Sequence, residues 1–489
     1  MAAEATVTER VASPRVSPLR AQEILGVLAF GIAPAVTAGI MAIGHLGGPG
    51  SGLLVFASVL LANWVLTHNR YPLHLMPFAA AFVRALVPIL GAGLTLAVLA
   101  AADRPGSVSS MVTPVIGAWI VTAFVAWSKL RFDAARPVRI AIIGSPTLAV
   151  GLAEELSNSK IRNYTVVGWV ADDRPTTDPG KGAPRRLGSF TQIREVVQRH
   201  SVDLIAHSNR PSPNKLSAID EDAFPPRLEI FERIAADCLD LPVRLIEVGQ
   251  LYEDLLGHVP LGQANSAWFQ YLLHPRFRAG SPLSKRAFDI VVGSVMLVLL
   301  SPVLLAFAIA VKLSDGGPVF YRQRRVGEGG REFELVKLRS MRVDSEDVGP
   351  RWSEEDDERV TQVGKVMRRL HIDEMPQLWH IVRGDMTLVG PRPEQRELIA
   401  NLEHQLPWYD RRHLVKPGLA GWAQARCGYG GSEEGTGWKL CHDFFYLKHR
   451  SVYFDALVLI ENVRISLRSG VQFGARSPQK EFITTEPAS

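Results

Sequence analysis

Apolar residues are concentrated near the start of this chain, where they form long runs instead of alternating with polar residues. The runs lie at about 21–44, 51–67, 76–102 and 109–130. Each approaches or exceeds the roughly 20 residues that an α-helix needs to cross the hydrocarbon core of a bilayer. A buried helical bundle in a soluble domain is the alternative, but several consecutive runs of this length disfavour it. The pattern predicts a four-helix transmembrane bundle over 21–130.

Positive charges lie in alternate connecting segments of these runs, which would all face the same side of a membrane. They precede the first run, separate the second from the third and follow the fourth, at Arg10, Arg15, Arg20, Arg70, Lys129, Arg131, Arg136 and Arg139. The other two loops, 47–50 and 101–110, carry little charge. Because positively charged loops stay on the cytoplasmic side, both ends of the bundle are predicted to be cytoplasmic, including a leader over 1–20.

A fifth apolar segment, at about 290–311, has a different charge pattern. Basic residues flank it on both sides, at Lys285, Arg286 and Lys312. Ser301-Pro302 stands near its middle, where proline removes a backbone hydrogen bond and kinks a helix. A kinked helix can still span a bilayer, but it would put the rest of the chain outside the cell. We therefore expect a re-entrant membrane helix over 285–312. Its hairpin residues are Lys285, Arg286, Asp289, Ser301 and Pro302.

Residues 138–250 alternate between strands and helices, which is typical of an α/β domain. Strands are predicted at 138–144, 166–170 and 202–206, and helices at 148–156 and 191–200. This pattern predicts a Rossmann-like domain over 138–250, followed by a linker over 251–284. Its first turn, Gly144-Ser145-Pro146, departs from Gly-x-Gly-x-x-Gly, because a proline stands where a second glycine would let a pyrophosphate approach. A structural or regulatory domain is favoured over a nucleotide-binding one.

Composition narrows the classes of partner. The chain has 489 residues, a net charge of +5 and a pI near 9.1. This excess is small for a nucleic-acid binder, and the basic residues flank apolar segments instead of forming one stripe, so no nucleic-acid partner is predicted. The cysteines, Cys238, Cys427 and Cys441, lack metal-ligand spacing and are expected to be free thiols. Asp220-Glu221-Asp222 imitates a metal-binding Asp-x-Asp, but its polar surroundings favour a solvated loop.

The candidate chemistry lies in the last third of the chain. Asp373-Glu374 follows the basic pair Arg368-Arg369 and precedes a stiff segment, Gly390-Pro391-Arg392-Pro393. Adjacent carboxylates stay ionised together only if a cation or a metal lies between them. Carboxylates, a metal and arginines are the groups that phosphoryl transfer uses. The proline on each side fixes the backbone φ, so Arg392 is expected to be held ready for a phosphate.

From Lys285 onward the chain resembles the bacterial sugar transferases, the polyprenyl-phosphate hexose-1-phosphate transferases. The matching segments occur in the family's order: Lys285-Arg286-Ala287-Phe288-Asp289, Ser301-Pro302, 316–327, Phe333, Lys337-Leu338-Arg339-Ser340-Met341, 357–361, Gly364, Asp373-Glu374, 390–394 and 416–424. The apolar bundle and the Rossmann-like domain ahead of them are similar to the family's long-form members. The resemblance implies a mainly α-helical catalytic domain over 313–476, and the polar tail over 477–489 is expected to be disordered.

The resemblance also implies a reaction and a place in the cell. Sugar-1-phosphate would pass from a UDP-sugar to a membrane polyprenyl phosphate such as undecaprenyl phosphate, which gives polyprenyl-diphospho-sugar and UMP. This is the first membrane step of exopolysaccharide, capsule or O-antigen assembly. Since one substrate is soluble and the other lies in the bilayer, the catalytic domain is expected on the cytoplasmic side of the bacterial inner membrane. A homo-oligomer is left open.

Roles for individual residues follow from the same resemblance. It implies that Asp373 attacks the sugar-bearing phosphate and that Glu374 holds Mg²⁺. The expected phosphate- or nucleotide-binding residues are Lys337, Arg339, Arg368, Pro391, Arg392 and Pro393. This sequence departs from the usual family residues at Met375, His380, Arg383 and Leu419. These departures bear on packing and substrate choice, and they leave the reaction type unchanged.

Two other functions are alternatives for this sequence. A sugar-nucleotide dehydratase or epimerase that uses NAD would need a Tyr-x-x-x-Lys pair, and no tyrosine in this chain has a lysine four residues later. A non-catalytic assembly subunit that binds polyprenyl phosphate would be expected to have a degenerate acidic pair. Asp373-Glu374 is intact, so the sequence favours the transferase.

Overall fold

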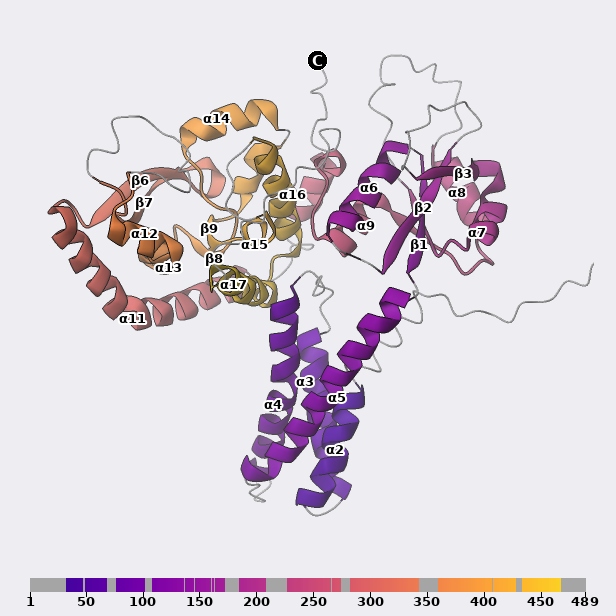
Figure 1. Cartoon of the computed structure of the whole chain (residues 1–489), viewed down its shortest axis with the longest axis horizontal. Coiled ribbons are helices and arrows are strands. Elements are labelled where there is room, and N and C mark those ends of the chain that lie inside the picture. Colours follow the sequence, from indigo (N-terminus) through magenta and orange to yellow (C-terminus); the bar gives the residue numbers. More distant parts are fainter. Residues whose placement is uncertain are drawn as a thin grey trace, which may run out of the picture. The chain divides into compact units, whose positions relative to one another are not determined.

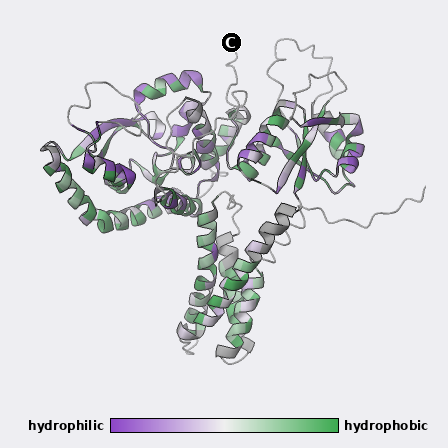
Figure 2. Ribbon diagram, in the orientation of Figure 1, coloured by the Kyte–Doolittle hydropathy of each residue, from purple (hydrophilic) through white to green (hydrophobic). Residues whose placement is uncertain are grey.

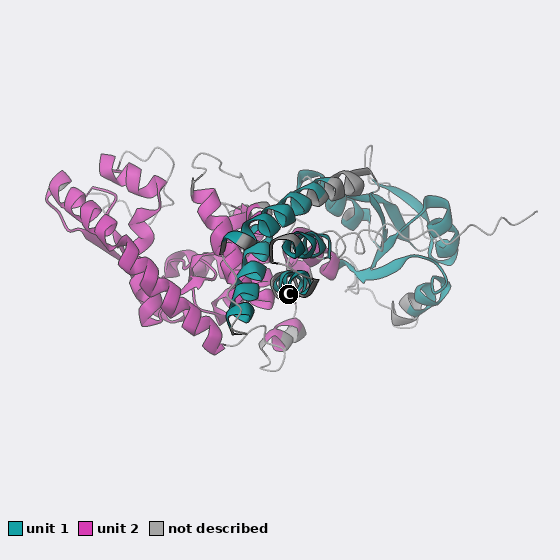
Figure 3. Cartoon of the chain, turned by 90° about the horizontal axis from the view of Figure 1, so that it is seen from below, with its two compact units in different colours: residues 1–70, 83–248 teal, residues 71–82, 249–489 magenta. Residues whose placement is uncertain are grey.

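The computed structural model describes residues 32–46, 49–67, 76–101, 108–135, 137–144, 146–159, 161, 163–171, 184–207, 227–264, 266–273, 282–342, 359–406, 408–427 and 433–467. The predicted leader 1–20, the tail 477–489 and the acidic triplet at 220–222 lie outside these residues. The chain divides into two compact units (Figure 3), one of Met1–Arg70 with Val83–Val248 and one of Tyr71–Phe82 with Gly249–Ser489.

Each predicted apolar run overlaps a helix, and the start of the first run, 21–31, lies outside the described residues. These are α2 (Ala33–Leu46), α3 (Pro49–Thr67), α4 (Pro77–Ala101) and α5 (Val108–Ala135). They share a core of mostly small residues: Ala35, Ala38, Ala42, Val55, Val59, Val87, Ala92, Met111 and Ala118. A Cβ added at Gly39 would lie only 2.8 Å from the carbonyl oxygen of Gly52, so α2 and α3 approach closely. Such close packing through small residues is typical of membrane helices.

The apolar surface of these helices faces outward as well as inward. Figure 2 shows hydrophobic colour along α2, α3 and α4, and large side chains such as Leu53 and Phe124 are exposed. Within the described residues, two helices are long and apolar enough to cross a membrane, Phe78–Ala100 and Pro282–Ser314. The other apolar helical stretches of this region are shorter: Ala33–Ile43, Ser51–Ala62 and Met111–Phe124.

The middle region contains a parallel sheet. Its strands are β1 (Val138–Ile143), β2 (Tyr164–Ala171), β3 (Arg185–Ser189), β4 (Leu204–His207) and β5 (Arg244–Glu247). They are all parallel in the order β3-β2-β1-β4-β5, as in a Rossmann-like fold. Figure 1 labels the first three strands of this order. The connecting helices are α6 (Pro146–Asn158), α7 (Ile193–His200) and α8 (Arg227–Asp237). Gly144 has φ +114°, and Pro146 begins α6, where its missing N–H costs no hydrogen bond.

A linker was expected over 251–284, but the described residues 251–264 and 266–273 are instead packed into the second unit. It contains part of α9 (Val248–Leu256), a short turn at Leu261–Gln263 and α10 (Ser266–Leu273). The carboxylate of Glu253 contacts Lys448 at 2.7 Å and His449 at 3.0 Å. Trp422 donates from Nε1 to the carbonyl of Gly257 at 2.7 Å. The apolar stretches of this segment are short and show no extended helical or strand periodicity in the sequence. Only their contacts in the folded structure reveal that they are buried.

The second unit is mainly helical and contains two small sheets. Its helices are α11 (Pro282–Asp315), α12 (Gln362–Arg369), α13 (Leu378–Arg383), α14 (Arg396–Gln405), α15 (Trp422–Cys427), α16 (Glu433–His449) and α17 (Val452–Leu467). Its strands are β6 (Phe320–Val326), β7 (Glu332–Leu338), β8 (Thr387–Val389) and β9 (Gly418–Ala420). β6 and β7 form an antiparallel hairpin, and β8 pairs with β9 in parallel. Two 3₁₀ helices complete the site region, η9 (Ile372–Gln377) and η10 (Tyr409–Leu414).

Helix α11 is continuous and does not break at Ser301-Pro302, although it changes direction along its course (Figure 1). Pro302 has no N–H to offer the carbonyl four residues earlier, which belongs to Val298. The hydroxyl of Ser301 donates to that carbonyl at 2.7 Å. The serine therefore supplies the hydrogen bond that the proline removes, so the helix bends at little cost.

Both ends of α11 pack against the second unit while its middle is exposed. Near its start, Gly293 faces Ile381 of α13. Near its end, Val311 is buried with Leu338 and Met367. Between these contacts the apolar side chains point outward, including Val298 and Leu299 at 70% and 71% exposure. A helix of this length, about 50 Å if straight, thus starts and finishes on the same folded unit.

Candidate active site

The acidic pair lies in the first turn of η9, directly after α12. His371 adopts φ +54° at the junction and turns the chain sharply. Asp373 is only 7% exposed. Burial raises the pKa of Asp373, and the charge of Glu374 raises it further, whereas Lys337 and Arg368 act in the opposite direction. The carboxyl of Asp373 is therefore held among cations in a site with little water.

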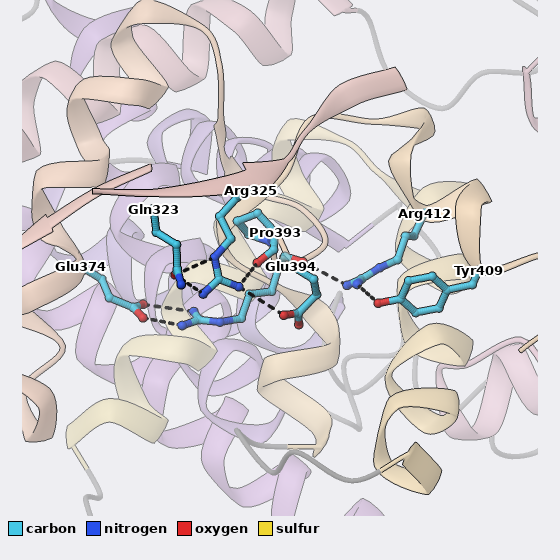
Figure 4. Close-up of polar contacts among 8 residues, drawn as sticks. Gln323, Arg325, Glu374, Pro393, Glu394, Tyr409 and Arg412 are labelled. Atoms are coloured by element: carbon cyan, nitrogen blue, oxygen red, sulfur yellow. Dashed lines mark hydrogen bonds and ion pairs between the residues drawn. The ribbon is translucent and has the colours of Figure 1, made fainter. Parts of the chain in front are cut away.

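Glu374 is paired with Arg392 through both of its carboxylate oxygens (Figure 4). Nη1 of Arg392 donates to Oε2 at 3.1 Å, and Nη2 donates to Oε1. Burial alone would raise the pKa of Glu374, but the charge and the hydrogen bonds of Arg392 outweigh it and lower the pKa to about 2. Glu374 is therefore ionised at any physiological pH, and this two-point contact also sets the plane of the arginine.

Lys337 of β7 stands beside the acidic pair. Its ammonium lies 5.1 Å from the centre of the Tyr321 ring on the neighbouring strand β6. Burial lowers the pKa of Lys337 to about 8, although Asp373 and Glu374 favour its charged form. The β6–β7 hairpin thus brings to the acidic pair a cation that can lose its charge near neutral pH.

The other predicted phosphate-binding residues have different surroundings. Arg368, in the last turn of α12, donates from Nε to the hydroxyl of Ser340 at 2.9 Å and lies near enough to Asp373 to lower its pKa. Arg339 is buried, and its guanidinium fills the space beside Gly317, where an added Cβ would collide with it. The structure therefore brings Lys337, Arg368 and Arg392 to the acidic pair and directs Arg339 to the Gly316-Gly317 turn.

The residues predicted for the membrane hairpin connect the start of α11 to the core of the second unit. Asp289 is buried and accepts hydrogen bonds from the hydroxyl of Thr387 at 2.7 Å and from the N–H of Leu388 at 3.1 Å. Arg286 donates to the carbonyls of Ile381 and Val382 at 2.6 Å each, at the end of α13. A cation at the carboxyl end of a helix satisfies the carbonyls that the helix leaves unpaired.

His380, one of the departures from the usual family residues, fills a structural position. Its Nε2 accepts from the N–H of Val336 at 3.2 Å, so the ring proton is on Nδ1, which lies 3.2 Å from Asp385. The side chain joins β7, which carries Lys337, to α13. This arrangement agrees with the expectation that His380 affects packing.

Sequence reasoning assigned no role to Arg325 and missed Arg412 altogether. Arg325 donates to the carbonyl of Pro393 at 3.2 Å, and Arg412 donates to the carbonyl of Arg392 at 3.2 Å. Arg412 also pairs with Asp443 of α16, which is buried. The sequence signal was weak, because Arg412 lies in a basic run, Arg411-Arg412-His413, and only the fold shows which member is buried.

Comparison with known proteins supports one family. Residues 280–469 match the bacterial sugar transferase family. UDP-glucose:undecaprenyl-phosphate glucose-1-phosphate transferase of Caulobacter vibrioides is 36% identical over 238 residues, which are 47% of this chain and 88% of that protein. UDP-N-acetylgalactosamine-undecaprenyl-phosphate N-acetylgalactosaminephosphotransferase of Aeromonas hydrophila is 39% identical over 246 residues, 50% of this chain and 57% of that protein.

A longer match extends this similarity toward the start of the chain. Undecaprenyl-phosphate glucose phosphotransferase of Komagataeibacter xylinus is 38% identical over 339 residues, which are 67% of this chain and 58% of that protein. The chain thus spans little more than half of the length of this relative and of the Aeromonas protein. The acidic pair, Lys337 and Arg392 all lie within the matched residues, and the chain belongs to the bacterial sugar transferase family.

Proposed function

We propose that this protein transfers a sugar-1-phosphate from a UDP-sugar to a membrane polyprenyl phosphate and releases UMP. The observation that carries the proposal is the arrangement of buried Asp373 among Lys337, Arg368 and the Glu374–Arg392 pair. This is a nucleophile surrounded by groups that bind phosphate. The relatives named above act on undecaprenyl phosphate, and a Rhizobium relative, 34% identical, is named an exopolysaccharide production protein. The product would therefore enter polysaccharide assembly.

Asp373 would act as the nucleophile. Its carboxylate oxygen attacks the sugar-bearing phosphorus, and the bond to the bridging oxygen breaks, so UMP leaves with the electron pair. An oxygen of the polyprenyl phosphate then attacks the same phosphorus and releases the carboxylate of Asp373. Two like charges about 4 Å apart repel by roughly 4 kcal/mol at an effective dielectric near 20, so the attack on an anionic diphosphate needs nearby cations. Lys337, Arg368 and Arg392 would supply them.

The residues at the acidic pair fit Mg²⁺ by their chemistry. Carboxylate oxygens are the ligands that Mg²⁺ prefers, and it is commonly bound through one or two carboxylates together with substrate phosphates. Among the described residues no group of three or more His, Cys, Asp and Glu could hold a metal. Glu374, with Asp373 beside it, is the ligand that we propose from this chain. Bound Mg²⁺ would neutralise charge on the diphosphate and on the departing UMP. Arg392, which now contacts Glu374, would bind the donor phosphate.

We also propose that α11 enters the cytoplasmic face of the bacterial inner membrane and returns without crossing it. Both of its ends contact the second unit, and only its middle exposes an apolar surface. Exposed Val366 of α12, Leu370 directly after it and Trp379 of α13 would add to the membrane contact. Helices α2 to α5 would form a four-helix transmembrane bundle. The acidic pair would then lie where a soluble donor meets a lipid acceptor.

A test is UMP release by the purified protein in detergent with polyprenyl phosphate, Mg²⁺ and a panel of UDP-sugars. The panel begins with UDP-glucose and UDP-N-acetylgalactosamine, the donors named for the relatives. We expect UMP from at least one donor only when the acceptor is present, and none from Asp373→Asn. The matched control is Asp410→Asn, an exposed aspartate, which should leave the rate unchanged. Activity retained in Asp373→Asn, or no UMP with any donor, would contradict the proposal.

A further inference from the structure

Each backbone carbonyl from Pro391 to Glu394, in the turn that carries Arg392, has a defined hydrogen-bond donor. The carbonyl of Pro391 accepts from the N–H of Gly418 at 2.9 Å, and that of Glu394 accepts from the N–H of Val326 at 3.0 Å. The carbonyls between them accept from two arginine side chains, Arg412 at the carbonyl of Arg392 and Arg325 at that of Pro393, both at 3.2 Å. The prolines fix φ, and these donors fix the carbonyls, so the backbone that carries the side chain of Arg392 is held in one conformation.

Arg412 is held by two side chains of the second unit, Tyr409 and Asp443. Its guanidinium donates from Nη1 to the hydroxyl of Tyr409 at 2.7 Å (Figure 4). It also pairs through Nη2 with Asp443 at 2.8 Å. Burial raises the pKa of Tyr409 to about 12, so its hydroxyl stays neutral and accepts this bond. Burying an arginine with a carboxylate is costly for stability, and an apolar pair often serves as well. The retained charge therefore suggests a task beyond packing.

We propose that Arg412 is a positioning residue for the donor diphosphate, acting through the carbonyl of Arg392. This inference rests on the proposed function. The guanidinium of Arg412 has a rigid planar fork, so Asp443 and Tyr409 set its plane. Its Nη2, which also donates to the carbonyl of Arg392, then fixes the turn. The fixed turn then holds the guanidinium of Arg392 beside Glu374. A diphosphate that enters the site would therefore meet a guanidinium that is already oriented. Arg412 itself touches no part of the substrate.

The test measures the KM for the UDP-sugar and kcat separately. Arg412→Lys keeps a charge beside Asp443 but loses the fork. The double variant Arg412→Met with Asp443→Leu removes both buried charges, so neither partner is left unpaired. We expect both variants to raise KM for the UDP-sugar about tenfold or more and to change KM for polyprenyl phosphate less than about twofold. Arg411→Met is the matched control, since the side chain of Arg411 is 41% exposed. It should leave the KM for the UDP-sugar and kcat unchanged.

A double-mutant cycle separates positioning from a general structural role. If Arg412 acts only through Arg392, then Arg412→Lys in an Arg392→Gln background should change KM less than about twofold further. Independent, multiplying effects would overturn the inference, as would an unchanged KM in folded Arg412 variants. These results differ from a failure of the proposed function, in which the wild type releases no UMP or Asp373→Asn stays active.

Discussion

Lys285 at the start of α11 and Asp455 in α17 lie 2.6 Å apart between Nζ and Oδ2, although they are far apart in the sequence. Asp455 is fully buried, and its other oxygen lies 2.9 Å from the hydroxyl of Tyr446. Burial raises the pKa of Asp455 to about 6, even though the charge of Lys285 acts against this shift. The pair attaches α11 to the core of the second unit.

Removing one partner of this pair should destabilise the fold. Lys285→Met leaves a buried carboxylate without its cation, which costs about 3 kcal/mol. The double variant Lys285→Met with Asp455→Leu removes both charges and should recover most of that loss. Denaturant unfolding in detergent measures the free energy of unfolding of the single and the double variant. Lys312→Met, which changes an exposed lysine near the other end of α11, is the control. Equal stability of the single variant and the control would show that the pair contributes nothing.

Glu374→Gln should change the response to metal more than the response to substrate. The amide keeps the shape of the side chain but is a weaker Mg²⁺ ligand and a weaker partner for Arg392. We expect the Mg²⁺ concentration for half-maximal rate to rise about tenfold or more. A titration of UMP release against Mg²⁺ measures the shift. An unchanged titration curve would remove Glu374 from the metal site.

The rate should fall at alkaline pH because Lys337 loses its charge. Its pKa is lowered to about 8, so its ammonium is present below that pH and is lost as the pH rises through it. Since the charged form attracts the donor diphosphate, kcat/KM for the UDP-sugar should decline above about pH 8. Lys337→Arg stays charged and should move the decline to higher pH, whereas Lys365→Arg, on the exposed face of α12, should not. Identical pH profiles for the unchanged protein, Lys337→Arg and Lys365→Arg would exclude Lys337 as the cause of the alkaline decline.

Straightening α11 should change its topology. With Pro302→Leu the helix regains an N–H for the carbonyl of Val298, so the reason for the bend disappears. We expect impermeant thiol reagents in intact cells to spare a cysteine placed at Ser314 or near the C-terminus of the otherwise unchanged protein. In Pro302→Leu a fraction should become labelled, and transfer should fall in proportion. Val303→Leu is the neighbouring control, and labelling of the otherwise unchanged protein would mean that the segment spans.

The packing of α9 and α10 predicts where the chain can be shortened. Since the matched motifs all follow Lys285, the sequence alone suggests that a protein starting at Pro282 keeps the chemistry. That protein loses the contacts of Glu253 with Lys448 and of Gly257 with Trp422. We therefore expect it to melt at least about 5 °C below one that starts at Val248, with a matching loss of transfer. Both lack 71–82, so the comparison isolates 248–281, and equal melting temperatures would contradict the role given to this segment.

The positions of the helices, of β1 and of the candidate site could be determined from the sequence alone, because run length, charge and short motifs are local properties of the chain. Run length and charge located the helices, a short apolar strand before a glycine located β1, and the Asp373-Glu374 motif located the candidate site. A proline in an apolar helix marked the position where α11 could bend.

The tertiary structure alone decided which of many similar residues act together. No local pattern separates Arg412 from Arg411, or assigns Asp455 to Lys285, because each contact joins segments that are distant in the chain. The same is true of Gly257 and Trp422, whose contact turns an apparent linker into part of the second unit. Burial sets the energy of these contacts, since an ion pair matters most where water is excluded, and burial is a property of the folded chain.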